Sequence, residues 1–196
     1  MAIPETCKAF RRTTGDVPRT IAPTTEQLPR ELGPNDVLIK IHAVSLNFRD
    51  VAMLHGRYPV EVIERGIPCS DAAAEVAAIG NAVKDFAIGD HVSVIFDLTK
   101  LTGAEDGPMQ ALGGDAEGVL RQYAVYEDKR LVQLPKHLSW EEVSHKRSFR
   151  RSLLGSTLTR IKPQAATVTC AGGTAWTSLN SLKSAGTPRS ALMQGL

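Results

Sequence analysis

Alternating apolar and polar positions predict several short β-strands. The clearest run spans residues 37–43, and one face of it is predicted to carry Val37, Ile39, Ile41 and Ala43. Further strands are predicted over residues 73–79, 91–96, 119–126 and 130–134. Turns rich in glycine and proline separate these runs and helix is scarce, which is typical of an all-β barrel or sandwich.

Two short helices are predicted beside the strands. Asn47 can cap a helix that runs through Leu54 and is ended by Gly56. Ser139-Trp140-Glu141-Glu142 forms a capping box at a second helix start. Because the apolar pattern becomes helical there, a domain boundary is predicted near Lys136, which divides the chain into residues 1–136 and 137–196.

Two other stretches carry no strand or helix prediction. The first 35 residues are rich in Pro and Thr and close in the turn Gly33-Pro34-Asn35-Asp36. Residues 99–118 are rich in glycine and are predicted to be an exposed loop.

The composition is that of a globular protein of 196 residues, 42% hydrophobic and 22% charged. No window approaches the roughly eighteen continuous apolar residues of a membrane span, and the first residues lack a secretory pattern. Cys7, Cys69 and Cys170 are odd in number and form no CxxC motif, which argues against a disulfide framework or a structural zinc site. We therefore expect a cytoplasmic protein.

The net charge of +2 hides one basic segment. Residues 143–164 hold six bases and no acids, and outside them 17 of the 23 lysines and arginines face 21 acids. A cationic helix for a membrane, a nucleic acid or an acidic partner is one interpretation of this segment. Its apolar positions form no sustained stripe, so we expect neither nucleic acid nor membrane as a partner.

Two polar clusters each follow an apolar run, at Asn47-Phe48-Arg49-Asp50 and at Cys69-Ser70-Asp71. Side chains at the ends of separate strands often meet in one cleft, which makes these clusters candidate site residues. Asn47 and Asp50 can instead be simple cap and turn residues, and Ser70-Asp71 can simply end a strand.

Other candidate residues have plainer roles. Cys69 and Cys170 are expected to be small buried hydrophobes. His42 and His91 are expected at the surface. Trp140 and Trp176 are expected to anchor helices in the core.

Five short motifs occur in a fixed order over about 140 residues. They are Val44-Ser45-Leu46-Asn47-Phe48-Arg49-Asp50, Pro68-Cys69-Ser70-Asp71, Gly89-Asp90-His91-Val92, Gly118-Val119-Leu120-Arg121-Gln122-Tyr123-Ala124-Val125 and Cys170-Ala171-Gly172-Gly173-Thr174-Ala175-Trp176. Together they resemble the N-terminal GroES-like domain of medium-chain dehydrogenases/reductases. The resemblance implies a mainly β fold, a GroES-like β-barrel followed by a fragment of an α/β Rossmann cofactor domain.

Within that family the chain resembles the zinc-free branch that is alcohol dehydrogenase-like or quinone reductase-like. Asn47 stands where zinc enzymes have a first Cys ligand, and Ser70-Asp71 stands where they have His-Glu. Cys170 matches the third ligand, but one soft ligand cannot hold Zn²⁺, which needs three protein ligands. No metal is therefore expected.

The resemblance also implies a reaction, hydride transfer from NADPH or NADH to a carbonyl or an activated C=C bond of a small molecule. Asn47 and Asp50 would be catalytic residues on the substrate side. Ser70 and Asp71 would line the substrate cleft, and Thr174 would bind the cofactor near its nicotinamide. The family allows a homodimer.

The family pattern is interrupted after Glu142 and is incomplete at the end. If residues 143–164 were removed, Glu142 and Ala165 would join into the family's helix, and these 22 codons could be a retained intron. The sequence ends at Leu196, before the glycine motif that binds pyrophosphate. Cofactor binding by this chain alone is therefore not expected. The alternative is a truncated, catalytically incompetent barrel that acts, if at all, through protein interaction.

Overall fold

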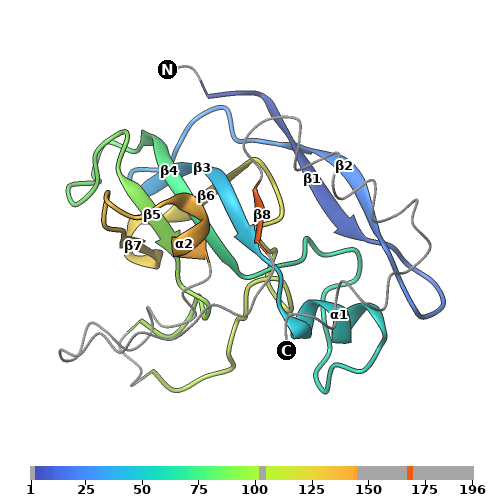
Figure 1. Cartoon of the computed structure of the whole chain (residues 1–196). Helices are drawn as coiled ribbons and strands as arrows, with labels where there is room; N and C mark the ends of the chain where they lie inside the picture. Colours follow the sequence, from blue (N-terminus) through green and yellow to red (C-terminus); the bar gives the residue numbers. More distant parts are fainter. Residues whose placement is uncertain (1–2, 102–104, 145–166, 170–196) are drawn as a thin grey trace.

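The computed structural model describes residues 3–101, 105–144 and 167–169. Its main sheet has the strand order β6-β3-β4-β5-β7, and β8 also pairs with β3 (Figure 1). The strands are β3 (Asp36–Ser45), β4 (Asp71–Ile79), β5 (His91–Val94), β6 (Tyr123–Glu127), β7 (Leu131–Gln133) and β8 (Thr167–Thr169). Each of these neighbours is antiparallel, which confirms the prediction of a mainly β fold.

A hairpin that the sequence did not predict lies beside this sheet. Its strands are β1 (Thr6–Arg12) and β2 (Ile21–Gln27). The backbone N–H of Phe10 donates to the carbonyl of Leu120 at 3.0 Å, and that of Gln122 donates to Lys8 at 2.9 Å. The alternation of apolar and polar residues is weak in this hairpin, because β1 ends in a buried arginine and none of the residues of β2 is fully buried.

A bulge in β3 changes which of its side chains share a face. The pairing with β4 shifts between Ile41 and Ala43, so Ala43 faces away from Ile41. Val37, Ile39 and Ile41 point into the main core as predicted. The prediction was wrong for Ala43, which packs in a second, smaller cluster.

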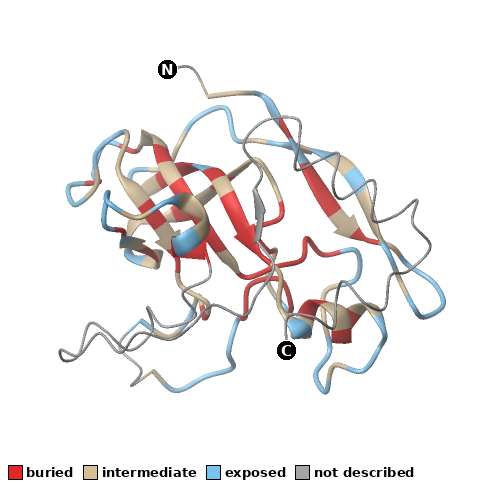
Figure 2. Ribbon diagram, viewed as in Figure 1, coloured by how far each residue is buried: buried red, intermediate tan, exposed pale blue. Residues whose placement is uncertain are grey.

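Buried residues are gathered on β1, β3 and β4 (Figure 2). They form two hydrophobic clusters, one on each face of the sheet. The larger one joins the sheet to the hairpin and includes Phe10, Ile39, Val76 and Leu120. The smaller one lies under the helix α2 (Trp140–Ser144) and contains Ala43, Ala73, Leu134 and Val143. Since alanines take these two sheet positions, the short helix can approach the strands closely.

Trp140 anchors α2 through the two histidines that were expected at the surface. Its ring stacks on His42 with centroids 4.3 Å apart, and it lies 4.0 Å from the ring of His91. The His42 side chain is only 12% exposed and its Nε2 lies 3.0 Å from Glu75. The surface prediction was therefore wrong for His42, because α2 covers its side of the sheet.

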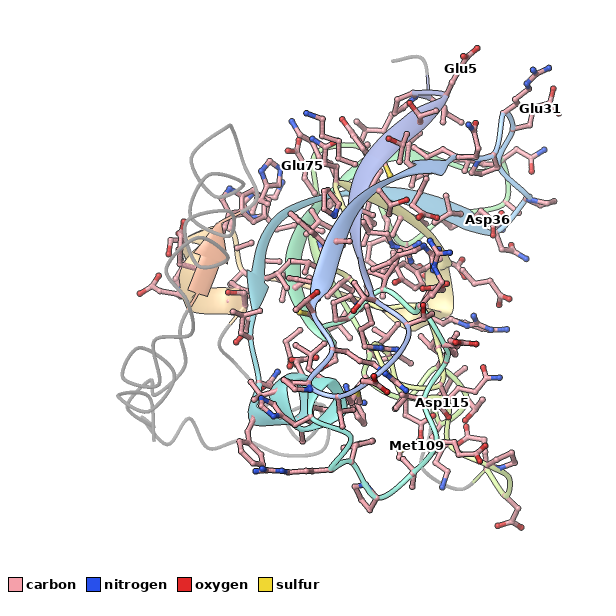
Figure 3. All side chains as sticks on the ribbon, turned by 90° about the vertical axis from the view of Figure 1, so that its right-hand side faces the viewer. Glu5, Glu31, Asp36, Glu75, Met109 and Asp115 are labelled. Carbon is pink, nitrogen blue, oxygen red and sulfur yellow. The ribbon has the colours of Figure 1, made fainter. Side chains whose placement is uncertain are left out.

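The glycine-rich stretch before β6 divides into two parts. Residues 106–110 are exposed, as predicted, but residues 111–114 and Gly118 are buried. Its buried part packs against the backbone of residues 67–69, beside the second polar cluster. A side chain would not fit there at Gly113 or Gly118. Figure 3 shows Asp115 and Met109 at the same end of the barrel as the helix α1 (Phe48–Leu54), and Glu5 and Glu31 at the other.

Neither helix in the described part of the chain is long and apolar enough to cross a membrane.

Candidate functional site

The two polar clusters meet at one end of the barrel because of the strand pairing. Ser45, the last residue of β3, is the register partner of Asp71, the first residue of β4. Asn47 lies two residues after Ser45 and caps α1 (Phe48–Leu54). Gly56, with φ +64°, follows the helix, so the predicted cap and end of the helix are confirmed. The antiparallel pairing therefore places Asn47 beside Ser70 and Asp71.

A single carboxylate oxygen holds the polar side chains of this site together. Asn47 Nδ2 donates to Asp71 Oδ2 at 2.6 Å, and Ser70 Oγ donates to the same oxygen at 3.0 Å. These bonds fix the plane of the Asn47 amide. Because a side-chain amide carries two N–H bonds, Asn47 keeps a second N–H that can bind a ligand. Ser70 is 3% exposed, whereas Asn47 and Asp71 are partly exposed.

Asp50 lies behind this pair and binds backbone groups of both clusters. Its Oδ2 accepts the backbone N–H of Asn47 at 2.9 Å, and its Oδ1 accepts that of Cys69 at 3.0 Å. The residue is 8% exposed. Burial raises the pKa of the Asp50 carboxyl above its ordinary value, while the two backbone N–H bonds act in the opposite direction.

The backbone at Cys69 is held in an uncommon conformation. Its φ is +69°, in the left-handed region that costs a non-glycine residue about 1–2 kcal/mol. Gly113 and Gly118 lie against it: a Cβ on Gly113 would stand 2.7 Å from the Cys69 carbonyl oxygen, and one on Gly118 would overlap with the carbonyls of Ile67, Pro68 and Cys69. The Cys69 side chain is buried, as predicted.

Two arginines that sequence reasoning missed support the glycine turn. Arg12 is 2% exposed; its Nη1 donates to the Gly113 carbonyl at 2.6 Å and its Nη2 to that of Ile63 at 3.0 Å. Burial lowers the pKa of the Arg12 guanidinium. Arg49 Nη1 donates to the Leu112 carbonyl at 2.7 Å. The sequence offered little indication of this role, because β1 does not alternate strictly: Ala9 and Phe10 are both buried, and Arg12 takes a buried position.

The predicted cofactor and metal residues have different outcomes. Thr174 and Cys170 lie outside the described residues, so their roles stay predictions. Within the described part of the chain, no group of three or more His, Cys, Asp or Glu side chains is placed to hold a metal ion. Asn47, Asp50, Ser70 and Asp71 are brought together, which agrees with the expectation that they share one site; their chemical roles stay predictions.

Known proteins are similar to this chain in sequence and in fold. A zinc-type alcohol dehydrogenase-like protein of Schizosaccharomyces pombe is 33% identical over 161 residues, which is 81% of this chain and 40% of that protein. A quinone oxidoreductase of Pseudomonas aeruginosa is 29% identical over 116 residues, 59% of this chain and 30% of that protein. The chain thus spans less than half the length of these relatives.

A solved structure is similar to this chain in both fold and sequence. A Sinorhizobium meliloti protein assigned as an alcohol dehydrogenase superposes with a TM-score of 0.65 and 29% identity, over 73% of this chain and 43% of that one. Residues 33–136 match the family of the alcohol dehydrogenase GroES-like domain. This chain therefore belongs to the alcohol dehydrogenase GroES-like domain family, within the medium-chain dehydrogenases/reductases.

Proposed function

We propose that this chain supplies the substrate side of an NAD(P)H-dependent reductase that acts on a carbonyl or on an activated C=C bond. The observation that carries the proposal is the amide of Asn47, which Asp71 fixes at one end of the barrel and which is partly exposed. An N–H donor held in this way can bind a carbonyl oxygen and stabilise the negative charge that develops on it during reduction.

The other residues of the site keep this donor in place. Asp71 orients the Asn47 amide, and Ser70 shares the same carboxylate oxygen. The carboxylate of Asp50 holds the backbone of Asn47 and of Cys69. In our proposal Asn47 therefore touches the substrate, and Asp50 is a positioning residue for both polar clusters.

The described residues do not fit a dinucleotide cofactor. A pyrophosphate site needs a glycine-rich turn between a strand and a helix, yet the loops that lead from β3 to α1 and from β7 to α2 contain no glycine. NAD(P)H would supply the hydride when it is bound. The cofactor site is proposed to lie in the domain that begins at residue 137, where Thr174 stands.

The retained-intron hypothesis for residues 143–164 bears on that domain. Val143 and Ser144 continue α2, while residues 145–164 lie outside the described residues. Sequencing of spliced transcripts tests the hypothesis, and uniform inclusion of the segment in mature message would reject it.

The proposed function is tested by turnover with a panel of substrates. The purified chain is mixed with NADPH or NADH and a quinone, an enone or an aldehyde, and the loss of cofactor absorbance is followed. Where a substrate is turned over, Asn47→Ala is expected to lower kcat/KM by about 10²-fold or more, as for the loss of one oxyanion donor. Asn81→Ala, in an exposed turn, is the matched control and should leave it unchanged. If no substrate is turned over and NADPH leaves the melting temperature unchanged, the incompetent barrel is the better account.

A further inference from the structure

The guanidinium of Arg49 is held next to the candidate site by an unusual set of neighbours. Its Nη1 donates to the carbonyl of Leu112 at 2.7 Å. Its Cζ lies 4.9 Å from the ring centroid of Phe96 and 5.4 Å from that of Tyr58. Contacts of this kind to two rings fix the plane of the group and partly replace the water that a cation loses on burial.

Two donors of this guanidinium are buried without a hydrogen bond. Arg49 Nε and Nη2 are both inaccessible to solvent, and the structure gives neither an acceptor. Since buried polar groups nearly always have a partner, such a pair calls for an explanation. Nε and Nη2 also lie along one edge of the guanidinium plane, the edge that binds both oxygens of a carboxylate at once.

The charges around this edge favour an anion. Neither Arg12 nor Arg49 forms an ion pair within the described part of the chain. Glu117, which acts on Arg12, is paired with Arg11. Of the two acids of the polar clusters, Asp50 is buried and already bonded to two backbone N–H groups, and Asp71 already accepts from Asn47 and Ser70. Arg12 is buried and Arg49 is partly buried, so the carboxylate of a ligand at the Arg49 edge would supply an acid where these two cations have no ion-pair partner among the described residues.

We propose that the Nε–Nη2 edge of Arg49, which follows Asn47 by two residues in the chain, is an anion subsite that takes the carboxylate group of a ligand. If the proposed function holds, on which this identification of the ligand rests, the substrates are carbonyl compounds or enones that carry a carboxylate. Bidentate binding would hold such a substrate in one orientation relative to the Asn47 amide.

A carboxylate can reach this edge only if a neighbouring group moves. Nη2 lies against the backbone of Gly114, where a Cβ would stand 2.9 Å from it. Tyr58, which covers one face of the guanidinium, is partly exposed and lies between exposed residues, Arg57 on one side and Pro59 on the other. Displacement of the Tyr58 ring is therefore the expected route of entry.

Direct binding tests the subsite without cofactor or turnover. The full chain is labelled with ¹⁵N-arginine, and the Nε–H resonance of Arg49 is followed as benzoate is added; benzamide is the neutral control of the same shape. Benzoate is expected to shift this resonance saturably, and benzamide is expected to leave it in place. Equal effects of the two compounds, or no saturable shift, would overturn the proposal and leave water as the partner of the two donors.

Variants locate the binding. Arg49→Lys keeps the charge but removes the bidentate edge, so benzoate affinity, measured by calorimetry, should fall at least about tenfold. Arg57→Lys, an exposed arginine of the same segment, should bind as the wild type does. Unchanged affinity in Arg49→Lys would overturn the subsite. If that variant fails to fold, the comparison of benzoate with benzamide in the wild type decides alone. Benzoate binding without turnover of any substrate would reject the proposed function and keep the subsite. Turnover without benzoate binding would reject the subsite and keep the proposed function.

Discussion

The two helices begin with the same local motif but have different surroundings. In α2, Glu142 accepts the backbone N–H of Ser139 at 3.0 Å and Ser139 Oγ accepts that of Glu142 at 3.2 Å, with the carboxylate exposed. In α1, Asp50 likewise accepts the N–H of its cap residue Asn47, but its carboxylate is buried and binds Cys69 as well.

The difference shows how a common capping device becomes part of a site. At α2, the carboxylate completes a local hydrogen-bond pattern and the remaining oxygen can face water. At α1, each carboxylate oxygen serves a different segment, so Asp50 ties the end of β3 to the turn before β4. The local sequence is similar in both cases, and the packing of the glycine turn on Cys69 makes the difference.

The largest expected effect on stability comes from filling the space at Gly118, against which the backbone of Cys69 packs. Gly118→Ala would push a methyl group into the backbone carbonyls of residues 67–69, and we expect a loss of about 3 kcal/mol in the free energy of unfolding. Gly89→Ala is the control: its φ is +88° but nothing lies within 4 Å, so only about 1 kcal/mol of strain is expected. Denaturant unfolding measures both, and equal losses would contradict the tight packing at Cys69.

A smaller effect on stability is expected when the two capping carboxylates, Asp50 and Glu142, are each replaced by the corresponding amide. Asparagine has one carbonyl oxygen where Asp50 uses two, so Asp50→Asn leaves a buried N–H without an acceptor and should cost about 2 kcal/mol. Glutamine keeps the single acceptor that α2 needs, so Glu142→Gln should change stability by less than about 0.5 kcal/mol. Equal losses in chemical denaturation would mean that burial adds nothing at α1.

The smallest effect concerns pH and the side of the sheet under α2. Burial lowers the pKa of His42 below its ordinary value of 6.5, against the opposing effect of Glu75; Lys40 and His91 lower it further. Because the unfolded chain binds this proton more readily, the stabilisation is present above pH 6.5 and is lost as the pH falls below it. His42→Gln should weaken the pH dependence of the melting temperature. An unchanged dependence would show that His42 keeps its ordinary pKa.

Much of the fold could be predicted because the strands of the main sheet follow a clear alternation. The starts of both helices were also predictable, since Asn47 and the Ser139–Glu142 box are local signals. The hairpin of β1 and β2 was missed, because Arg12 is buried only through carbonyls supplied by residues about 50 and 100 positions away. The bulge in β3 was missed as well, since a register shift depends on the partner strand.

The barrel class and the family could be inferred from the residue pattern alone, and the four residues of the candidate site were chosen from it as well, although their roles stay predictions. Short-range periodicity and the order of the motifs are properties of the chain alone, so no packing is needed to detect them. The contacts among these residues emerge only when the chain is folded. Folding buries Asp50 between two segments, fixes the Asn47 amide on Asp71 and, within the described residues, leaves the Nε–Nη2 edge of Arg49 without a hydrogen-bond acceptor. Those outcomes depend on contacts between distant residues, whose burial decides how strong each polar contact becomes.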